Sequence, residues 1–333
     1  MQDRGPDELS FQQSCALLSD IASFAQPVIV LSGGEPLVRD DILDIARFGD
    51  QLGLRMVLAT NGTLVDEDVA RRLVDSGIRR VSVSLDGADA QTHDSFRGLR
   101  GAFEAALRGI EFCKAAGMPV QVNTTVAKHN LSQLPAVLEL ALSMGACALH
   151  LFLLVPTGCG KEIAGREMIS PDQYEQVLSW LYDASKTASI SLKATCAPHY
   201  FRVMRQRAKA EGIEITPETH GLEAMTKGCL AGSAVCFVSH KGDVYPCGYL
   251  PVSAGSVLDT PLSRIWRESE LFAALRDPSL LKGKCGGCEY ARVCGGCRAR
   301  AYAETGDYLD EEPYCVYEPR PATQSSRRAG RRR

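Results

Sequence analysis

The stretch Val28-Ile29-Val30-Leu31-Ser32-Gly33-Gly34-Glu35-Pro36 joins a short aliphatic run to a turn of small residues and one carboxylate. Further apolar, mostly β-branched runs follow at residues 55–59, 80–85, 120–126 and 148–155. Segments with the apolar spacing of amphipathic helices lie between them, at residues 40–52, 66–76, 102–116 and 131–144. Buried strands that alternate with helices predict an α/β fold with a parallel sheet, either open or closed as a barrel.

Glycines support this division of the chain. Each of the four helical segments is followed by a glycine, at Gly53, Gly77, Gly117 and Gly145. A glycine after the last helical turn adopts the left-handed conformation that ends a helix. We therefore expect each helix to stop at these positions.

Polar residues follow the predicted strands. Ser32 to Pro36 follow the first strand, Thr60-Asn61-Gly62 the second and Ser84-Leu85-Asp86-Gly87 the third, while Asn123 lies within the fourth. Ligands of parallel α/β sheets bind beyond the carboxyl ends of the strands. Paired glycines let a ligand approach the backbone closely, the Glu35 carboxylate can accept hydrogen bonds from an ammonium group, and Ser84 with an arginine can hold a carboxylate.

Cysteines dominate the last third of the chain. Eight of the thirteen lie between residues 229 and 315, at Cys229, Cys236, Cys247, Cys285, Cys288, Cys294, Cys297 and Cys315. A zinc ribbon is one interpretation of two Cys-x2-Cys pairs. Eight thiols exceed what one zinc needs and match the ligands of two four-iron clusters. Iron–sulfur electron transfer is therefore the chemistry that we expect here.

The second half of the chain changes character. Residues 171–187, 198–211 and 262–275 are expected to be helical, with a short strand at 190–194. Residues 236–239 and 243–246 flank Lys241-Gly242 as a hairpin would. Residues 320–333 are rich in proline, serine and arginine and are expected to form a disordered basic tail.

Composition points to an ordinary globular protein. The 333 residues are 45 % hydrophobic and 23 % charged, with a net charge of −3, which argues against a nucleic-acid partner. No apolar run approaches the ~20 residues of a membrane span, and the first residues lack the apolar core of a signal peptide. Clustered thiols without such a signal favour a reducing, cytoplasmic location.

Two of these motifs together resemble the radical S-adenosylmethionine superfamily. Gly33-Gly34-Glu35-Pro36 after an apolar strand is similar to its motif for the methionine amino group, and residues 82–87 with 93–97 resemble its next landmark. The resemblance implies that Ser84 and Arg97 reach the methionine carboxylate. It also implies that S-adenosylmethionine contacts Gly33, Gly34, Glu35, Pro36, Asn61, Ser84, Arg97 and Asn123.

The C-terminal cysteines resemble the SPASM extension of the same superfamily, with Cys294-x2-Cys297 in place of the usual x3 spacing. This resemblance implies one auxiliary [4Fe-4S] cluster on Cys229, Cys236, Cys247 and Cys297. It implies another on Cys285, Cys288, Cys294 and Cys315. The expected organisation is a partial (β/α)6 barrel at 1–190 that lacks its first strand, a helical connection at 191–228 and the cluster domain at 229–319.

Residues 154–158, 192–200, 216–221 and 294–302 resemble the haem synthases of the sirohaem-dependent pathway. That family implies oxidative decarboxylation of two propionates of iron-coproporphyrin III to vinyl groups. It also implies an external electron donor or acceptor such as ferredoxin or flavodoxin. A porphyrin with four carboxylates needs cations, and the candidates for binding it are His199, Arg202 and Arg205.

The Cys-x3-Cys-x2-Cys motif that defines the superfamily is absent before the Gly-Gly-Glu-Pro turn, where only Cys15 occurs. Three thiolates hold the cluster that cleaves S-adenosylmethionine in this superfamily. We therefore expect an N-terminally truncated or degenerate chain that is inactive as it stands. A radical peptide maturase and a non-catalytic iron–sulfur electron carrier remain alternatives.

Overall fold

The computed structural model describes residues 7–320, so the basic tail predicted at 320–333 lies outside the described residues except for Arg320. Six strands form one parallel sheet in the order in which they occur along the chain. They are β1 (Val28–Leu31), β2 (Arg55–Thr60), β3 (Val81–Ser84), β4 (Val120–Val126), β5 (Ala148–Leu153) and β6 (Ser191–Thr195).

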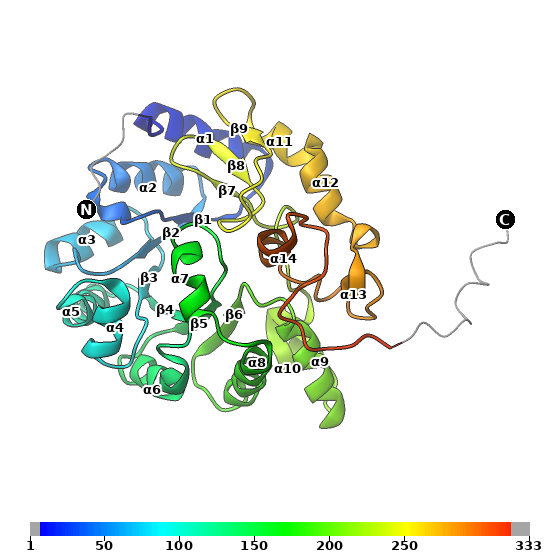
Figure 1. Ribbon diagram of the computed structural model, residues 1–333. Helices are drawn as coiled ribbons and strands as arrows, with labels where there is room; N and C mark the ends of the chain where they lie inside the picture. The colour runs from blue at the N-terminus through cyan, green and yellow to red at the C-terminus, as the bar shows by residue number, and fades with distance from the viewer. Residues whose placement is uncertain (1–6, 321–333) are drawn as a thin grey trace.

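Helices cover the convex face of this curled sheet, as Figure 1 shows. They are α1 (Phe11–Phe24), α2 (Ile42–Gln51), α3 (Glu67–Asp75), α4 (Ala90–Arg97), α5 (Ala102–Ala115), α6 (Leu134–Ser143) and α8 (Pro171–Ser185). The chain turns back with positive φ at Gly53, Gly77, Gly117 and Gly145. The predicted glycine stops are therefore confirmed.

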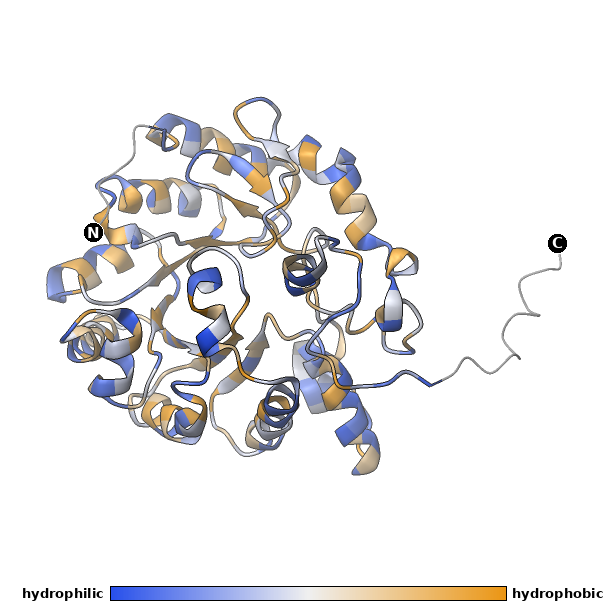
Figure 2. Cartoon of the chain, in the orientation of Figure 1, coloured by the Kyte–Doolittle hydropathy of each residue, from blue (hydrophilic) through white to orange (hydrophobic). Residues whose placement is uncertain are grey.

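The main hydrophobic core lies between the sheet and these helices. Leu58, Val83, Val122 and Leu149 are fully buried in it, one from each of four neighbouring strands. In Figure 2 the strands of the sheet are coloured mostly as hydrophobic residues, whereas the helices carry a mixture of hydrophobic and hydrophilic residues. Because side chains alternate along a strand, the neighbouring residues face the concave side.

The sheet is an open half-barrel. The described strands β1 and β6 are its two edges, and neither pairs with the other. Val28 and Val30 of β1 are 52 % and 56 % exposed. The prediction of a partial barrel is thus confirmed.

The cysteine-rich part of the chain packs beside the open end of the half-barrel (Figure 1). It contains β7 (Phe237–Val238), β8 (Asp243–Tyr245), β9 (Gly255–Ser256), α11 (Leu262–Glu268), α12 (Glu270–Arg276), α13 (Gly283–Gly286) and α14 (Arg298–Thr305). β7 and β8 pair antiparallel, as the predicted hairpin requires. The single helix predicted at 262–275 is wrong: it is two helices, because the Ser269 side chain accepts the Phe272 N–H and caps α12.

Three further α-helices complete the described structure. α7 (Cys159–Glu167) follows β5, while α9 (Tyr200–Ala210) and α10 (Pro217–His220) follow β6 and lead to the cysteine-rich part. Because β6 pairs with β5, the sheet extends past the boundary predicted at residue 190. α1 also contacts the cysteine-rich part, since the Asp20 carboxylate accepts the backbone N–H of Ser263 at 2.9 Å and its hydroxyl at 2.7 Å.

Candidate functional site

The turn after β1 is held by Glu35. One carboxylate oxygen accepts from the Thr60 hydroxyl at 2.7 Å and from the Leu37 N–H at 3.1 Å, and the other accepts from the Asn61 N–H at 2.8 Å. Both oxygens are therefore engaged within the chain. Glu35 fastens the turn after β1 to the turn after β2, and this is the role that the geometry shows for it.

The backbone of the same turn remains open. Gly33 has φ +149°, and no atom lies within 4 Å of the position that a Cβ would take at Gly33 or Gly34. Pro36 is buried at the start of the 3-10 turn Pro36–Val38. The carbonyl and amide groups of the two glycines can thus contact a ligand while Glu35 keeps the loop in place.

Asn61 lies in the next turn, but its side chain is used locally. Its Oδ1 accepts from the Thr63 N–H at 2.8 Å and from the Thr63 hydroxyl at 2.7 Å. This arrangement orders the turn after β2. Since Oδ1 is used in this way, the predicted cofactor contact of the Asn61 side chain would be made through its amide nitrogen.

One row of polar side chains crosses the concave face. Ser84 on β3 is in register with Asn123 on β4, Asn123 with His150 on β5, and His150 with Lys193 on β6. Gln121 connects this row, since its amide nitrogen lies 2.7 Å from Asn123 Oδ1 and 3.0 Å from His150 Nδ1. Two predicted contacts, Ser84 and Asn123, are therefore brought together.

His150 and Lys193 were not predicted. Burial, together with the positive charges of Lys193 and Arg80, lowers the pKa of His150 to about 4. A neutral imidazole between two cations is suited to a ligand that brings negative charge. The alternation of side chains along a strand was the one sequence signal for these positions. That alternation does not say which residues of neighbouring strands lie side by side.

Arg97 is engaged by a buried carboxylate. Its guanidinium lies 2.6 Å from Asp86, whose side chain is fully buried, while that of Arg97 is 33 % exposed. Asp86 also accepts the backbone N–H of Thr125 at 2.6 Å. Arg97 therefore neutralises Asp86, and only its exposed part is available for the predicted methionine carboxylate.

Four cysteines line one cavity in the C-terminal part: Cys285, Cys288, Cys294 and Cys315. This is the set predicted for one auxiliary cluster. The described residues contain no group of three or more His, Cys, Asp or Glu side chains already arranged around a single metal ion.

Hydrogen-bond donors point at these sulfurs. The backbone N–H groups of Tyr290, Gly296 and Glu312 lie 3.4, 3.4 and 3.3 Å from the sulfurs of Cys288, Cys294 and Cys285. Two guanidinium groups are also close, with Arg202 at 3.9 Å from Cys315 and Arg298 at 3.8 Å from Cys285. Donors and cations around thiolates stabilise the negative charge of an iron–sulfur cluster, so these residues fit such a group.

His199 lines the same cavity. The side chain is fully buried, and neither ring nitrogen has a hydrogen-bond partner among the described residues. Burial lowers its pKa well below the usual range, with further lowering by Arg300, Arg202 and Lys284. A neutral imidazole with a free N–H faces the cysteine cavity, which makes His199 a neighbour of the cluster site.

The two arginines predicted to bind substrate differ. Arg202 is buried and donates two hydrogen bonds, of 2.7 and 2.6 Å, to the Glu175 carboxylate. Its charge is already paired beside the cysteine cavity, so it is not free to bind a substrate carboxylate. Among the described residues, Arg205 donates to the Phe201 carbonyl alone, at 3.1 Å.

The cysteines of the other predicted cluster are only partly brought together. Cys247 and Cys297 pack in a small core with Val155 and Leu250, whereas Cys236 packs against the main core. Cys229 lies against the 294–297 loop, because its N–H donates to the Cys294 carbonyl at 3.1 Å. Cys196, which was not predicted as a ligand, packs in the small core.

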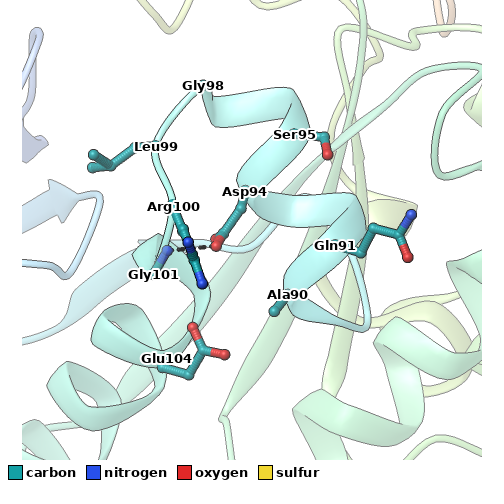
Figure 3. Close-up of a pocket in the computed structure, with 9 residues that line it drawn as sticks. All are labelled: Ala90, Gln91, Asp94, Ser95, Gly98, Leu99, Arg100, Gly101 and Glu104. Carbon is teal, nitrogen blue, oxygen red and sulfur yellow. Dashed lines mark hydrogen bonds between the residues drawn. The ribbon is translucent and has the colours of Figure 1, made fainter.

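A hollow of about 480 Å³ lies between α4 and α5 (Figure 3). The Asp94 carboxylate in it accepts the backbone N–H groups of Gly101 and Phe103 at 2.5 and 2.8 Å. Asp94 thereby fixes the turn between the two helices.

In residues 7–320, no helix has the length and apolarity needed to cross a membrane.

Comparison with known proteins agrees with this geometry. Residues 3–141 match the Radical SAM superfamily, and residues 229–298 match the SPASM iron–sulfur cluster-binding domain. The AdoMet-dependent heme synthase of Methanosarcina barkeri is 56 % identical over 94 % of this chain and 88 % of its own length. That of Oleidesulfovibrio alaskensis is 48 % identical over 97 % and 83 %.

A solved structure supports the fold. The crystal structure of Streptococcus suis SuiB bound to S-adenosylmethionine superposes with a TM-score of 0.73 at 16 % identity, over 95 % of this chain and 72 % of that chain. At this identity the likeness concerns the fold alone.

Proposed function

Because the chain belongs to the radical S-adenosylmethionine superfamily and carries its SPASM domain, we propose that it is a haem synthase. The proposed reaction is the oxidative decarboxylation of two propionates of iron-coproporphyrin III to vinyl groups. The observation that carries this proposal is the 56 % identity to an AdoMet-dependent heme synthase across nearly the whole chain.

The concave face is the proposed binding surface for cofactor and substrate. Open glycine backbone after β1 and the Ser84–Asn123 pair would hold S-adenosylmethionine, which with its own cluster would supply the radical chemistry. Glu35 keeps the first of these elements in position. Arg97, through its exposed part, would add positive charge for the methionine carboxylate.

Cations on the same face suit a substrate with several carboxylates. Arg80 donates to Gln121 at 3.4 Å, and Lys193 neighbours His150 in the polar row. Hydrogen bonds from such cations to a carboxylate are stronger than hydrogen bonds between neutral groups. Arg80 and Lys193 therefore favour a porphyrin that bears carboxylates over an uncharged ligand.

The C-terminal part would accept the electron that each decarboxylation releases. The proposed division of the chain extends the barrel from 190 to Thr195, so that it includes β6, and places the connection from there to 228 and the cluster domain at 229–319. Ferredoxin or flavodoxin would exchange electrons with this domain. The cysteine side chains that the structure describes form no disulfides, which suits the reducing cytoplasm, where we place the protein.

Optical titration with iron-coproporphyrin III under anaerobic conditions tests the substrate without requiring turnover. A saturable shift of the porphyrin band at an equimolar ratio is expected. Lys193→Gln should weaken binding roughly ten- to a hundredfold, because a charge-assisted hydrogen bond contributes about 1.5–3 kcal/mol. Lys241→Gln, which removes an exposed charge paired with Asp7 at the surface, is the control.

An iron porphyrin with its carboxylates esterified should bind poorly to the wild-type chain. If the esterified porphyrin binds as tightly as the tetra-acid, or if iron-coproporphyrin III does not bind, the proposed substrate is wrong. Binding of a short peptide in its place would favour a peptide maturase.

A further inference from the structure

Cys196 lies at the end of β6, where it packs into the small core that also holds Cys247 and Cys297. The spacing of the cysteines along the chain gives no reason to group it with them, because 32 residues separate Cys196 from Cys229. The fold brings it there, since β6 ends beside the loop that precedes α14.

Gly228 shows how close these segments are. A Cβ at Gly228 would lie 2.5 Å from the Pro198 carbonyl oxygen and 2.7 Å from the Cys294 carbonyl oxygen. The backbone that leads into Cys229 is therefore pressed between the turn after Cys196 and the cysteine loop. This packing holds Cys229 next to the turn after Cys196 and to the loop that contains Cys294 and Cys297.

One buried ion pair holds Cys196 and Cys297 together. Arg300 donates to the Cys196 carbonyl at 3.0 Å and to Glu312 at 3.2 Å. Glu312 in turn accepts the Cys297 N–H at 2.7 Å. The backbones of both cysteines are thus fixed by the same pair of charges.

The backbone of Cys196 is unusual. With φ +58°, it is the one non-glycine residue with positive φ in the described part of the chain. Such strain persists only where the surroundings enforce it, and it concentrates at functional sites. The Tyr174 hydroxyl, which donates to the Cys196 carbonyl at 2.9 Å, and Arg300 are the groups that enforce it.

We propose that Cys196, and not Cys236, is the fourth ligand of the auxiliary cluster that Cys229, Cys247 and Cys297 hold. The proposal rests on those three cysteines being ligands, as assigned above, and is independent of the porphyrin substrate. The role of Cys236 is then that of a small apolar residue packed against the main core.

Iron content and EPR spectra of the anaerobically reconstituted chain test this assignment. We expect about four irons from each of the two auxiliary clusters. Cys196→Gly removes the thiol and suits the positive φ, so that strain does not complicate folding. Its iron content should fall by about one to four per chain, or the EPR signal of one cluster should change, because three thiolates leave one iron without a cysteine ligand.

Cys236→Ala is the matched control and should retain the wild-type iron content and spectrum. The proposal is overturned if Cys196→Gly matches the wild type in both measurements, or if Cys236→Ala loses iron. Cys247→Ala must lose iron, and if it does not, the assignment of the whole ligand set is wrong. Should Cys196→Gly not fold, Cys196→Ser is judged by the same criteria.

Discussion

Arg300 and Glu312 form an ion pair at 3.2 Å, and each side chain is about 1 % exposed. Arg300 also donates to the carbonyls of Leu153 and Leu154 at the end of β5, at 3.4 and 3.3 Å. Its guanidinium lies 4.9 Å from the centre of the Tyr174 ring. One residue of the cluster domain is therefore bound to the carboxyl ends of the last two strands of the sheet.

The pair predicts a large stability effect from a single substitution. Arg300→Met should lower the free energy of unfolding by about 3–5 kcal/mol, because Glu312 is left as a buried charge without a partner. Chemical denaturation followed by circular dichroism measures this. Arg264→Met breaks the exposed pair with Glu268 and should cost less than about 1 kcal/mol. Equal effects of the two substitutions would contradict the account of Arg300.

Glu35 gives a prediction for the cofactor site. Glu35→Gln keeps the size of the side chain but replaces one acceptor by a donor that faces either the Asn61 N–H or the Thr60 hydroxyl. The loop should loosen, with a loss of about 1–3 kcal/mol in unfolding free energy. Affinity for S-adenosylmethionine, measured by calorimetry, should fall with it. Asp40→Asn, an exposed carboxylate nearby, should change neither quantity.

Much of the fold was predictable from the sequence because it depends on local patterns. Aliphatic runs, glycine stops and the Lys241-Gly242 turn each act over a few residues. The polar row was not predictable as a row, since the register of Ser84, Asn123, His150 and Lys193 follows from pairing between strands. The resemblance to the SPASM extension implied Cys236 as a ligand, because such a pattern follows order along the chain. Packing in three dimensions instead places Cys196 with Cys247 and Cys297.

His150 predicts a pH dependence of stability. Its pKa is about 4 in the folded protein, against roughly 6.5 unfolded. As the pH falls from about 6.5 to about 4, the unfolded chain takes up this proton first, so stability falls by at most about 1.4 kcal/mol per pH unit. His150→Gln should therefore reduce this slope, as measured by denaturation at several pH values. His240→Gln, at an exposed site, should leave the slope unchanged.

Cys196→Gly should cost the metal-free protein about 1 kcal/mol less stability than Cys236→Gly, because glycine accepts the positive φ that cysteine holds under strain. Both substitutions lose a packed side chain and add chain entropy, but only the one at residue 196 relieves backbone strain. Denaturation of both variants in the presence of a chelator measures the difference. A loss of stability in Cys196→Gly of the same size would mean that the backbone at residue 196 is not strained.

Arg202 and Arg205 lie on the same helix and separate a cluster role from a substrate role. Arg202 lies 3.9 Å from the Cys315 sulfur, whereas Arg205 contacts the Phe201 carbonyl. Removing a buried positive charge beside an iron–sulfur cluster disfavours its reduced form. Arg202→Gln should thus lower the potential of that cluster by roughly 30–100 mV in an EPR-monitored redox titration.

The control variant, Arg205→Gln, should leave the potential unchanged. If Arg205→Gln weakens porphyrin binding and Arg202→Gln does not, Arg205 retains the predicted substrate role. An unchanged potential in Arg202→Gln would show that its charge is fully compensated by Glu175.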